Sequence, residues 1–122
     1  MINMEPPEEK ALIEEERAIL VSKGYTVGTD VHMVPGKTQW GVADVIAKRG
    51  DTILCVECKY INRTNPTQKR KKVKDQAMMY ASWMKCRNHY KRVFAAIHTN
   101  EERRILCEVK YTESYQRLKS LF

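Results

Sequence analysis

The chain has 122 residues, enough for one domain with its own core, and 43% of them are hydrophobic, which argues against disorder. No apolar run is long enough to span a membrane, and the acidic start lacks the layout of a secretion signal. We therefore expect an intracellular protein, cytoplasmic or, in a eukaryote, nuclear, with no membrane partner. The net charge is +7, but residues 1–16 hold six glutamates and one lysine, so the remainder carries +12. Such charge favours a polyanionic partner, nucleic acid first among them.

The first predicted element is a helix that begins near Pro7, where proline fits the first turn, and ends at Gly24. Apolar residues recur at helical spacing between these limits. Alternating apolar and polar residues then predict three strands, at 25–34, 38–47 and 52–60. The apolar side chains of the first strand are expected on one face: Tyr25, Val27, Val31 and Met33.

A hairpin turn at residues 48–51 joins the second and third strands. The elements after the hairpin are a basic loop, a helix at 73–88, strands at 92–99 and 104–111, and a short helix at 112–121. The order αβββαβ, followed by a C-terminal strand and helix, predicts a single α/β domain over residues 1–122. We expect a mixed central sheet flanked by helices.

Two acidic residues and a lysine are expected on one face of this hairpin. A two-residue turn at Gly50 and Asp51 places Asp44 directly opposite Glu57, and Lys59 shares the face of Glu57 because side chains alternate along a strand. Two carboxylates in an apolar frame repel each other, and a divalent cation that prefers hard oxygen ligands, such as Mg²⁺, would relieve the repulsion. The alternative is an exposed polar face with an ordinary cross-strand pair of lysine and glutamate.

Each of the two longer predicted helices adds polar residues to the candidate site. Glu16 projects from the apolar face of the first helix, whereas Glu15 points away. A core-facing glutamate needs a partner, which a shared metal would supply; the alternative is a solvated side chain at a partly exposed helix end. Gln76 and Tyr80 are four residues apart and share one face of the second helix. There the alternative is that Tyr80 belongs to the core and Gln76 forms hydrogen bonds at its rim.

The densest positive charge lies just before the second helix. Five basic side chains fall within seven residues: Lys69, Arg70, Lys71, Lys72 and Lys74. We expect this run to contact phosphate groups, and the alternatives are a solvated surface or a nuclear-import signal.

Cys55 and Cys58 form a Cys-x-x-Cys pair, a pattern that can indicate zinc or redox chemistry. Both fall within the third predicted strand, where their sulfur atoms should point to opposite faces. We therefore expect ordinary buried thiols and no zinc.

Asp44, in the segment 41–47, and Glu57-Cys58-Lys59 resemble the two motifs of the PD-(D/E)XK nucleases, with Ala43 in place of the proline. The predicted element order is also similar to the restriction-endonuclease-like core of that superfamily. The resemblance covers roughly residues 8–99 and implies metal-dependent hydrolysis of phosphodiester bonds in DNA, with Mg²⁺ as the cofactor and Mn²⁺ as a substitute.

The resemblance also implies roles for individual residues. The metal ligands would be Asp44, Glu57, the backbone carbonyl of Cys58, and Glu16, directly or through water. Lys59 would orient the attacking water and stabilise the charge that develops on the phosphate, and Gln76 would position water or phosphate. The basic run would grip the DNA backbone, with Tyr80 as a further contact: Lys69, Arg70, Lys71, Lys72 and Lys74.

Two groups within the superfamily are most similar. Archaeal Holliday-junction resolvases are also small and basic, with an acid in the first helix, matched by Glu16, and a glutamine after the lysine motif, matched by Gln76. RecB-like nucleases carry Gln-hydrophobic-x-x-Tyr in that helix, which Gln76 and Tyr80 match. Some RecB-like members hold a four-cysteine iron–sulfur cluster, but the cysteines here follow another layout, so no cluster is expected. The glycine- and serine-rich loop of the resolvases is not evident before Asp44.

The resulting expectation is a structure-selective endonuclease that prefers branched DNA. Resolving a four-way junction needs two symmetric cuts, so we expect a homodimer. The apolar residues that offer candidate dimer surfaces are Met78, Met79, Trp83, Tyr115, Leu118, Leu121 and Phe122. The alternatives are a RecB-like exonuclease and a catalytically weak nucleic-acid-binding module of the same fold.

Overall fold

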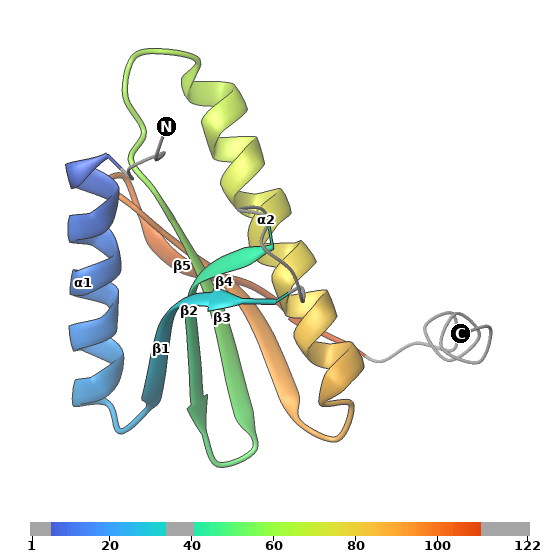
Figure 1. Ribbon diagram of the computed structural model, residues 1–122. Coiled ribbons are helices and arrows are strands. Elements are labelled where there is room, and N and C mark those ends of the chain that lie inside the picture. The colour runs from blue at the N-terminus through green and yellow to red at the C-terminus, as the bar shows by residue number, and fades with distance from the viewer. Residues whose placement is uncertain (1–5, 34–40, 111–122) are drawn as a thin grey trace.

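The computed structural model describes residues 6–33 and 41–110 (Figure 1). In chain order, its elements are α1 (Pro7–Ser22), β1 (Thr26–His32), β2 (Val42–Arg49), β3 (Thr52–Lys59), α2 (Pro66–Arg87), β4 (Arg92–Thr99) and β5 (Arg103–Val109). The predicted order αβββαβ and the strand that follows it are confirmed. The short helix expected at 112–121 lies outside the described residues, as do four of the candidate dimer residues: Tyr115, Leu118, Leu121 and Phe122.

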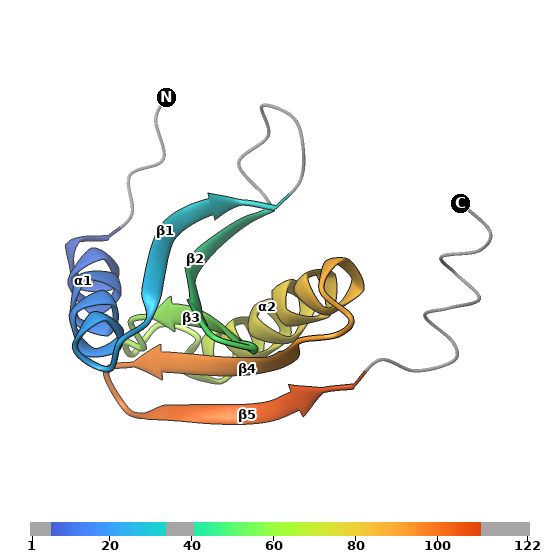
Figure 2. The ribbon, with the colours of Figure 1, turned by 90° about the horizontal axis from the view of Figure 1, so that it is seen from below.

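The five strands form one sheet in the order β1-β2-β3-β4-β5. Neighbouring strands are antiparallel except for β3 and β4, which are parallel and connected through α2. Figure 2 shows α1 and α2 on opposite sides of the curved sheet. The expected α/β fold with a mixed sheet flanked by helices is therefore confirmed. Neither helix in the described part of the chain combines the length and the apolar character needed to cross a membrane.

Two apolar clusters, one on each side of the sheet, form the core. On the α1 side the buried residues are Leu12, Ile13, Leu20, Val45, Ala47, Leu54, Val56, Cys58 and Ala96. On the α2 side they include Ala43, Ile46, Ile53, Cys55, Val73, Ala77, Tyr80, Ala81, Met84, Val93, Ala95 and Ile97. Met78, Met79 and Trp83 pack partly against the second cluster, so the monomer already covers part of that candidate dimer surface.

The hairpin register matches the prediction. Val45 pairs with Val56, and the ladder ends at Arg49 and Thr52, next to the two-residue turn. Gly50 occupies the first turn position with a φ of +56°, a left-handed conformation that glycine adopts without steric cost. This register makes Asp44 and Glu57 the next opposed pair at the open end of the hairpin.

The predicted single apolar face of β1 is wrong. Tyr25 and Val27 pack against the α1-side cluster, whereas Val31 and Met33 belong with the α2-side cluster. Between these pairs lies Asp30, which has a left-handed backbone with a φ of +50°. A residue in this conformation interrupts the two-residue alternation of a strand, so the side chains after it change face.

The second helix begins earlier than predicted. Pro66 occupies its first turn, where the missing N–H has no helical partner to lose, and the preceding Asn65 is left-handed with a φ of +49°. Lysine and arginine are strong helix formers, so the basic residues continue the helix from this start. The run at 69–74 therefore lies on α2 rather than in a loop.

Candidate active site

Asp44 and Glu57 meet where the regular pairing of β2 and β3 ends. Side-chain oxygens act as hydrogen-bond acceptors here: the Asp44 N–H donates to Oε1 of Glu57 at 3.0 Å, and the Cys58 N–H donates to Oδ2 of Asp44 at 2.9 Å. Glu57 is only 4% exposed. The opposed placement expected from the hairpin is therefore present, and it brings a buried and a half-buried carboxyl group together.

The surroundings of Asp44 favour its neutral form. Burial raises the pKa of the Asp44 carboxyl above its ordinary value, and hydrogen bonds to the Cys58 N–H and the Glu57 carboxyl oppose this rise only in part. The negative charges of Glu9 and Asp30 raise the pKa of Asp44 further. The pair thus favours binding of a positive species, either a proton or a metal cation.

Lys59, at the end of β3, is tied to the first turn of α1. Its Nζ lies 3.1 Å from Oε1 of Glu9, and the two side chains are 26% and 13% exposed. Glu9 also acts on Asp44 through its charge. The acid of α1 that lies near Lys59 and Asp44 is therefore Glu9. It precedes Glu16, the residue expected there from the sequence, by two helical turns.

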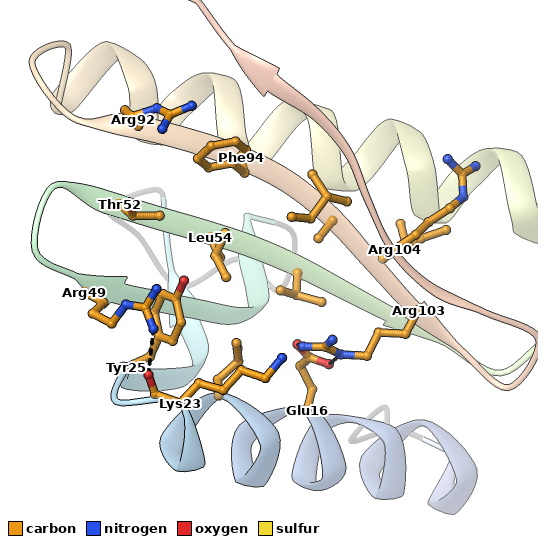
Figure 3. Close-up of a pocket in the computed structure, with 15 residues that line it drawn as sticks. Glu16, Lys23, Tyr25, Arg49, Thr52, Leu54, Arg92, Phe94, Arg103 and Arg104 are labelled. Carbon is orange, nitrogen blue, oxygen red and sulfur yellow. Dashed lines mark hydrogen bonds and ion pairs between the residues drawn. The ribbon is translucent and has the colours of Figure 1, made fainter.

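Glu16 is buried as its helical phase predicts, at 1% exposure, but the structure places it elsewhere. Its carboxylate accepts hydrogen bonds from Nε and Nη2 of Arg103 at 2.6 and 2.8 Å (Figure 3). Oε2 of Glu16 also lies 2.7 Å from Nδ1 of His98. His98 pairs in register with Cys58, whose side chain belongs to the α1-side cluster. Glu16 therefore lies across the sheet from the carboxylate pair, which does not fit its predicted role as a metal ligand beside Asp44.

Asp30 is an acid near the site that sequence reasoning missed. The register pairs Thr29 with Val45 and Val31 with Ala43, which leaves Asp30 opposite Asp44. The row of acids thus extends from β3 across β2 to β1, and the charge of Asp30 raises the pKa of Asp44. The register of β1 depends on the connection at 34–40, whose length gives no pairing rule, so the sequence offered no clear signal.

α2 places Tyr80 behind the carboxylate pair. The ring is buried, at 3% exposure, and packs edge-to-face on Trp83 with the centroids 5.7 Å apart. Burial raises the pKa of the Tyr80 hydroxyl, and the negative charges of Glu57 and Asp44 raise it further. This placement fits a supporting role in the site better than the expected direct contact with nucleic acid.

A shallow groove on α2 contains Gln76, one turn before Tyr80. Its volume is about 280 Å³, and its lining residues are Gln68, Lys71, Lys72, Asp75, Gln76 and Met79. Three side chains of the basic run have polar partners within the chain: Lys69 with Asn62, Arg70 with Glu101, and Lys71 with Asp75. Within the run, Lys72 combines an exposed position with direct contact to the groove that holds Gln76.

The Cys-x-x-Cys pair is divided between the two faces of the sheet, as predicted. Cys55 belongs to the α2-side cluster and Cys58 to the α1-side cluster, and both are buried. Burial raises the pKa of the Cys55 thiol to about 12, and the charge of Glu57 contributes to that rise. The two sulfur atoms therefore do not form a shared binding site.

The chemistry of the carboxylate pair suits a hard divalent cation. The backbone hydrogen bonds to Oε1 of Glu57 and Oδ2 of Asp44 hold the two carboxylates next to each other, and carboxylate oxygens are ligands that such a cation prefers. The N–H of Cys58 points toward Asp44, and the carbonyl of the same strand residue points to the same side. In residues 6–33 and 41–110, no three acidic, histidine or cysteine side chains converge as a metal cluster, so the fit rests on two carboxylates and a backbone carbonyl.

Comparison of the chain with protein-family models, with curated proteins and with solved structures found no match in any of the three.

Proposed function

We propose that this chain is a metal-dependent nuclease of the PD-(D/E)XK type that hydrolyses phosphodiester bonds in DNA. The observation that carries the proposal is the pair of Asp44 and Glu57, in which the Asp44 N–H donates to Glu57 and the Cys58 N–H donates to Asp44. Lys59 follows two residues after Glu57, on the same face of β3. A buried and a half-buried acid side by side are costly for folding alone, which supports a role in binding a cation and a charged substrate.

Asp44, Glu57 and the Cys58 carbonyl would hold Mg²⁺, with Mn²⁺ as a substitute. When bound, the ion supplies polarisation of the phosphate and a lower pKa of the attacking water. Lys59 would donate a hydrogen bond to that water or to a phosphate oxygen, and its positive charge would stabilise the negative charge that develops on the phosphate. Glu9 positions the Lys59 ammonium through the contact at 3.1 Å.

The exposed basic face of α2 would hold the DNA backbone. Lys72 and Gln76 share the groove on this helix, so a phosphate bound by Lys72 lies beside the glutamine. Gln76 would then position water or the scissile phosphate. Tyr80, buried behind Glu57, excludes water from that side of the carboxylate.

The proposed substrate is branched DNA cut by a homodimer, as in the Holliday-junction resolvases. The basic charge of the chain and the acid that α1 supplies, Glu9, support this form of the proposal. The position of Tyr80 after Gln76 supports the RecB-like exonuclease as the second candidate, because both residues are on the α2 side of the carboxylates.

The test is a cleavage panel of four-way junction, flap, linear duplex, single strand and RNA, each with Mg²⁺, with Mn²⁺ and with a chelator. We expect metal-dependent cutting of DNA and faster cutting of the junction than of a duplex of equal length. Light scattering at micromolar concentration tests the dimer.

Asp44→Asn is the matched control, because it keeps the shape of the side chain and removes its charge. We expect it to be inactive with every substrate. Cleavage by this folded variant at the wild-type rate would refute the site. Digestion of linear DNA from its ends by a monomer would favour the exonuclease, and junction binding without any cleavage would favour a binding module.

A further inference from the structure

A second concave region lies on the opposite side of the sheet from the carboxylate pair. It is a pocket of about 320 Å³ between the C-terminal part of α1 and the α1 side of strands β3, β4 and β5 (Figure 3). Its apolar floor includes Leu54, Val56 and Ala96, which belong to the α1-side cluster. This volume falls within the range of pockets that bind small ligands in proteins.

Two pairs of arginine and aromatic rings flank the floor of the pocket. The guanidinium of Arg49 lies 4.4 Å from the ring centroid of Tyr25, and that of Arg92 lies 5.1 Å from the ring centroid of Phe94. Figure 3 shows these pairs on opposite sides of Leu54. Flat aromatic and guanidinium surfaces at both sides of an apolar floor suit a planar, aromatic ligand.

The lining of the pocket has a net positive charge. Five of its lining residues are basic and one is acidic: Lys23, Arg49, Arg92, Arg103, Arg104 and Glu16. Glu16 is paired with Arg103. Arg49 donates to the backbone carbonyl of Lys23 at 2.7 Å, and because a carbonyl is neutral this hydrogen bond does not neutralise the charge of Arg49.

Two further cations of the pocket form ion pairs at the surface. Arg104 pairs with Glu102, and because these side chains are 45% and 43% exposed the pair is weak. Arg92 is 63% exposed and donates two hydrogen bonds to Glu108, which is 17% exposed. A ligand with several anionic oxygens can replace Glu102 at Arg104 and bind the exposed side of the Arg92 guanidinium.

We propose that this pocket binds a nucleoside phosphate, with the base on the apolar floor and the phosphate on the surrounding arginines. A fatty acid would fill the floor equally well, but its one carboxylate would meet only part of a rim with several cations. A phosphate offers more oxygens and more charge, which suits bidentate arginine contacts. The ligand is either a free nucleotide or the terminal nucleotide of a DNA strand, since both present the same chemistry.

The test is calorimetry with the full chain carrying Asp44→Asn, in chelator, so that no DNA is cut. The titrants are adenosine 5′-monophosphate, adenosine, inorganic phosphate, decanoate, and a short single strand with or without a 5′-phosphate. Because neither metal nor catalysis enters this measurement, its outcome is independent of the proposed nuclease activity.

We expect one saturable site for the nucleotide, with affinity at least about tenfold above that for adenosine or inorganic phosphate. Arg49→Gln and Arg92→Gln should each weaken binding about tenfold. Arg17→Gln, at an exposed position of α1 that does not line the pocket, is the control that should bind as before. Competition by the 5′-phosphorylated strand but not by the unphosphorylated strand would identify the strand end as the ligand; no competition would identify the free nucleotide.

Equal binding of the nucleotide and inorganic phosphate would overturn the proposal, as would tighter binding of decanoate than of the nucleotide. Unchanged binding in both arginine variants, with melting temperatures equal to that of the parent protein, would also overturn it. Phe94→Leu, in the apolar wall of the pocket, provides a second check. It should weaken binding of the nucleotide without changing binding of inorganic phosphate.

Discussion

Glu16 and Glu57 are both almost fully buried, and they lie on opposite sides of the same sheet. Glu16 receives its countercharge from Arg103, and His98 lies within hydrogen-bond distance of it. Glu57 lies beside a second acid, Asp44, whose pKa is raised by burial. A buried acid paired with an arginine stabilises the folded state, whereas two neighbouring acids repel each other and favour the binding of a proton or a cation.

The largest expected effect separates these two glutamates by activity. Glu57→Gln should reduce DNA cleavage by at least about 10²-fold while leaving the melting temperature unchanged or higher, because it removes one of two repelling charges. Glu16→Gln should leave the rate unchanged at a temperature where the variant is folded. Rates with Mg²⁺ on the preferred substrate test this, and equal losses in the two variants would contradict the assignment.

The second effect compares the same two glutamates by stability, where Glu16 is expected to matter more than Glu57. Glu16→Gln should lower the free energy of unfolding by about 2 kcal/mol, less than for a fully buried pair because Arg103 is 37% exposed. Glu15→Gln is the matched control, since Glu15 is 61% exposed and should lose almost nothing. Urea denaturation measures both, and identical midpoints would show that Glu16 contributes no stability.

The third effect is a pH dependence of the metal-free protein. The folded state raises the pKa of Asp44, so it holds a proton more tightly than the unfolded chain does. This contribution is fully present below the ordinary aspartate pKa and is lost as the pH rises through the raised value, so stability falls across that interval. In Asp44→Asn the fall should be absent. Denaturation curves in chelator at mildly acidic pH provide the comparison, and parallel curves for both proteins would reject it.

The smallest effect concerns the basic face of α2. Lys72→Gln should flatten the dependence of DNA binding on salt by about 0.9 in the log–log slope, as expected for one lost phosphate contact. Arg70→Gln should change the slope less, because Arg70 is already paired with Glu101 at 2.7 Å. Binding titrations at several salt concentrations measure both slopes. A larger change for Arg70 would mean that the ion pair opens and that the DNA lies nearer the start of α2.

The element order and the hairpin register could be predicted because they depend on local alternation and on a two-residue turn. Counting residues back from the turn was enough to predict that Asp44 and Glu57 lie opposite each other. It failed for β1, where the left-handed Asp30 changes which face the side chains occupy. It also failed for α1: Glu9 and Glu16 lie on one helical stripe, and periodicity indicates that both face inward. Which of them reaches Lys59 depends on how the helix lies across the sheet, which no local pattern specifies.

The hydrogen bonds at the open end of the hairpin make two backbone amides reporters of the site. The N–H groups of Asp44 and Cys58 donate to carboxylate oxygens. Their protection from hydrogen exchange and their chemical shifts therefore depend on the charge and on any bound cation at the two acids. An ion that draws those oxygens away would loosen this end of the sheet, so occupancy of the site can be followed without a substrate and without measuring catalysis.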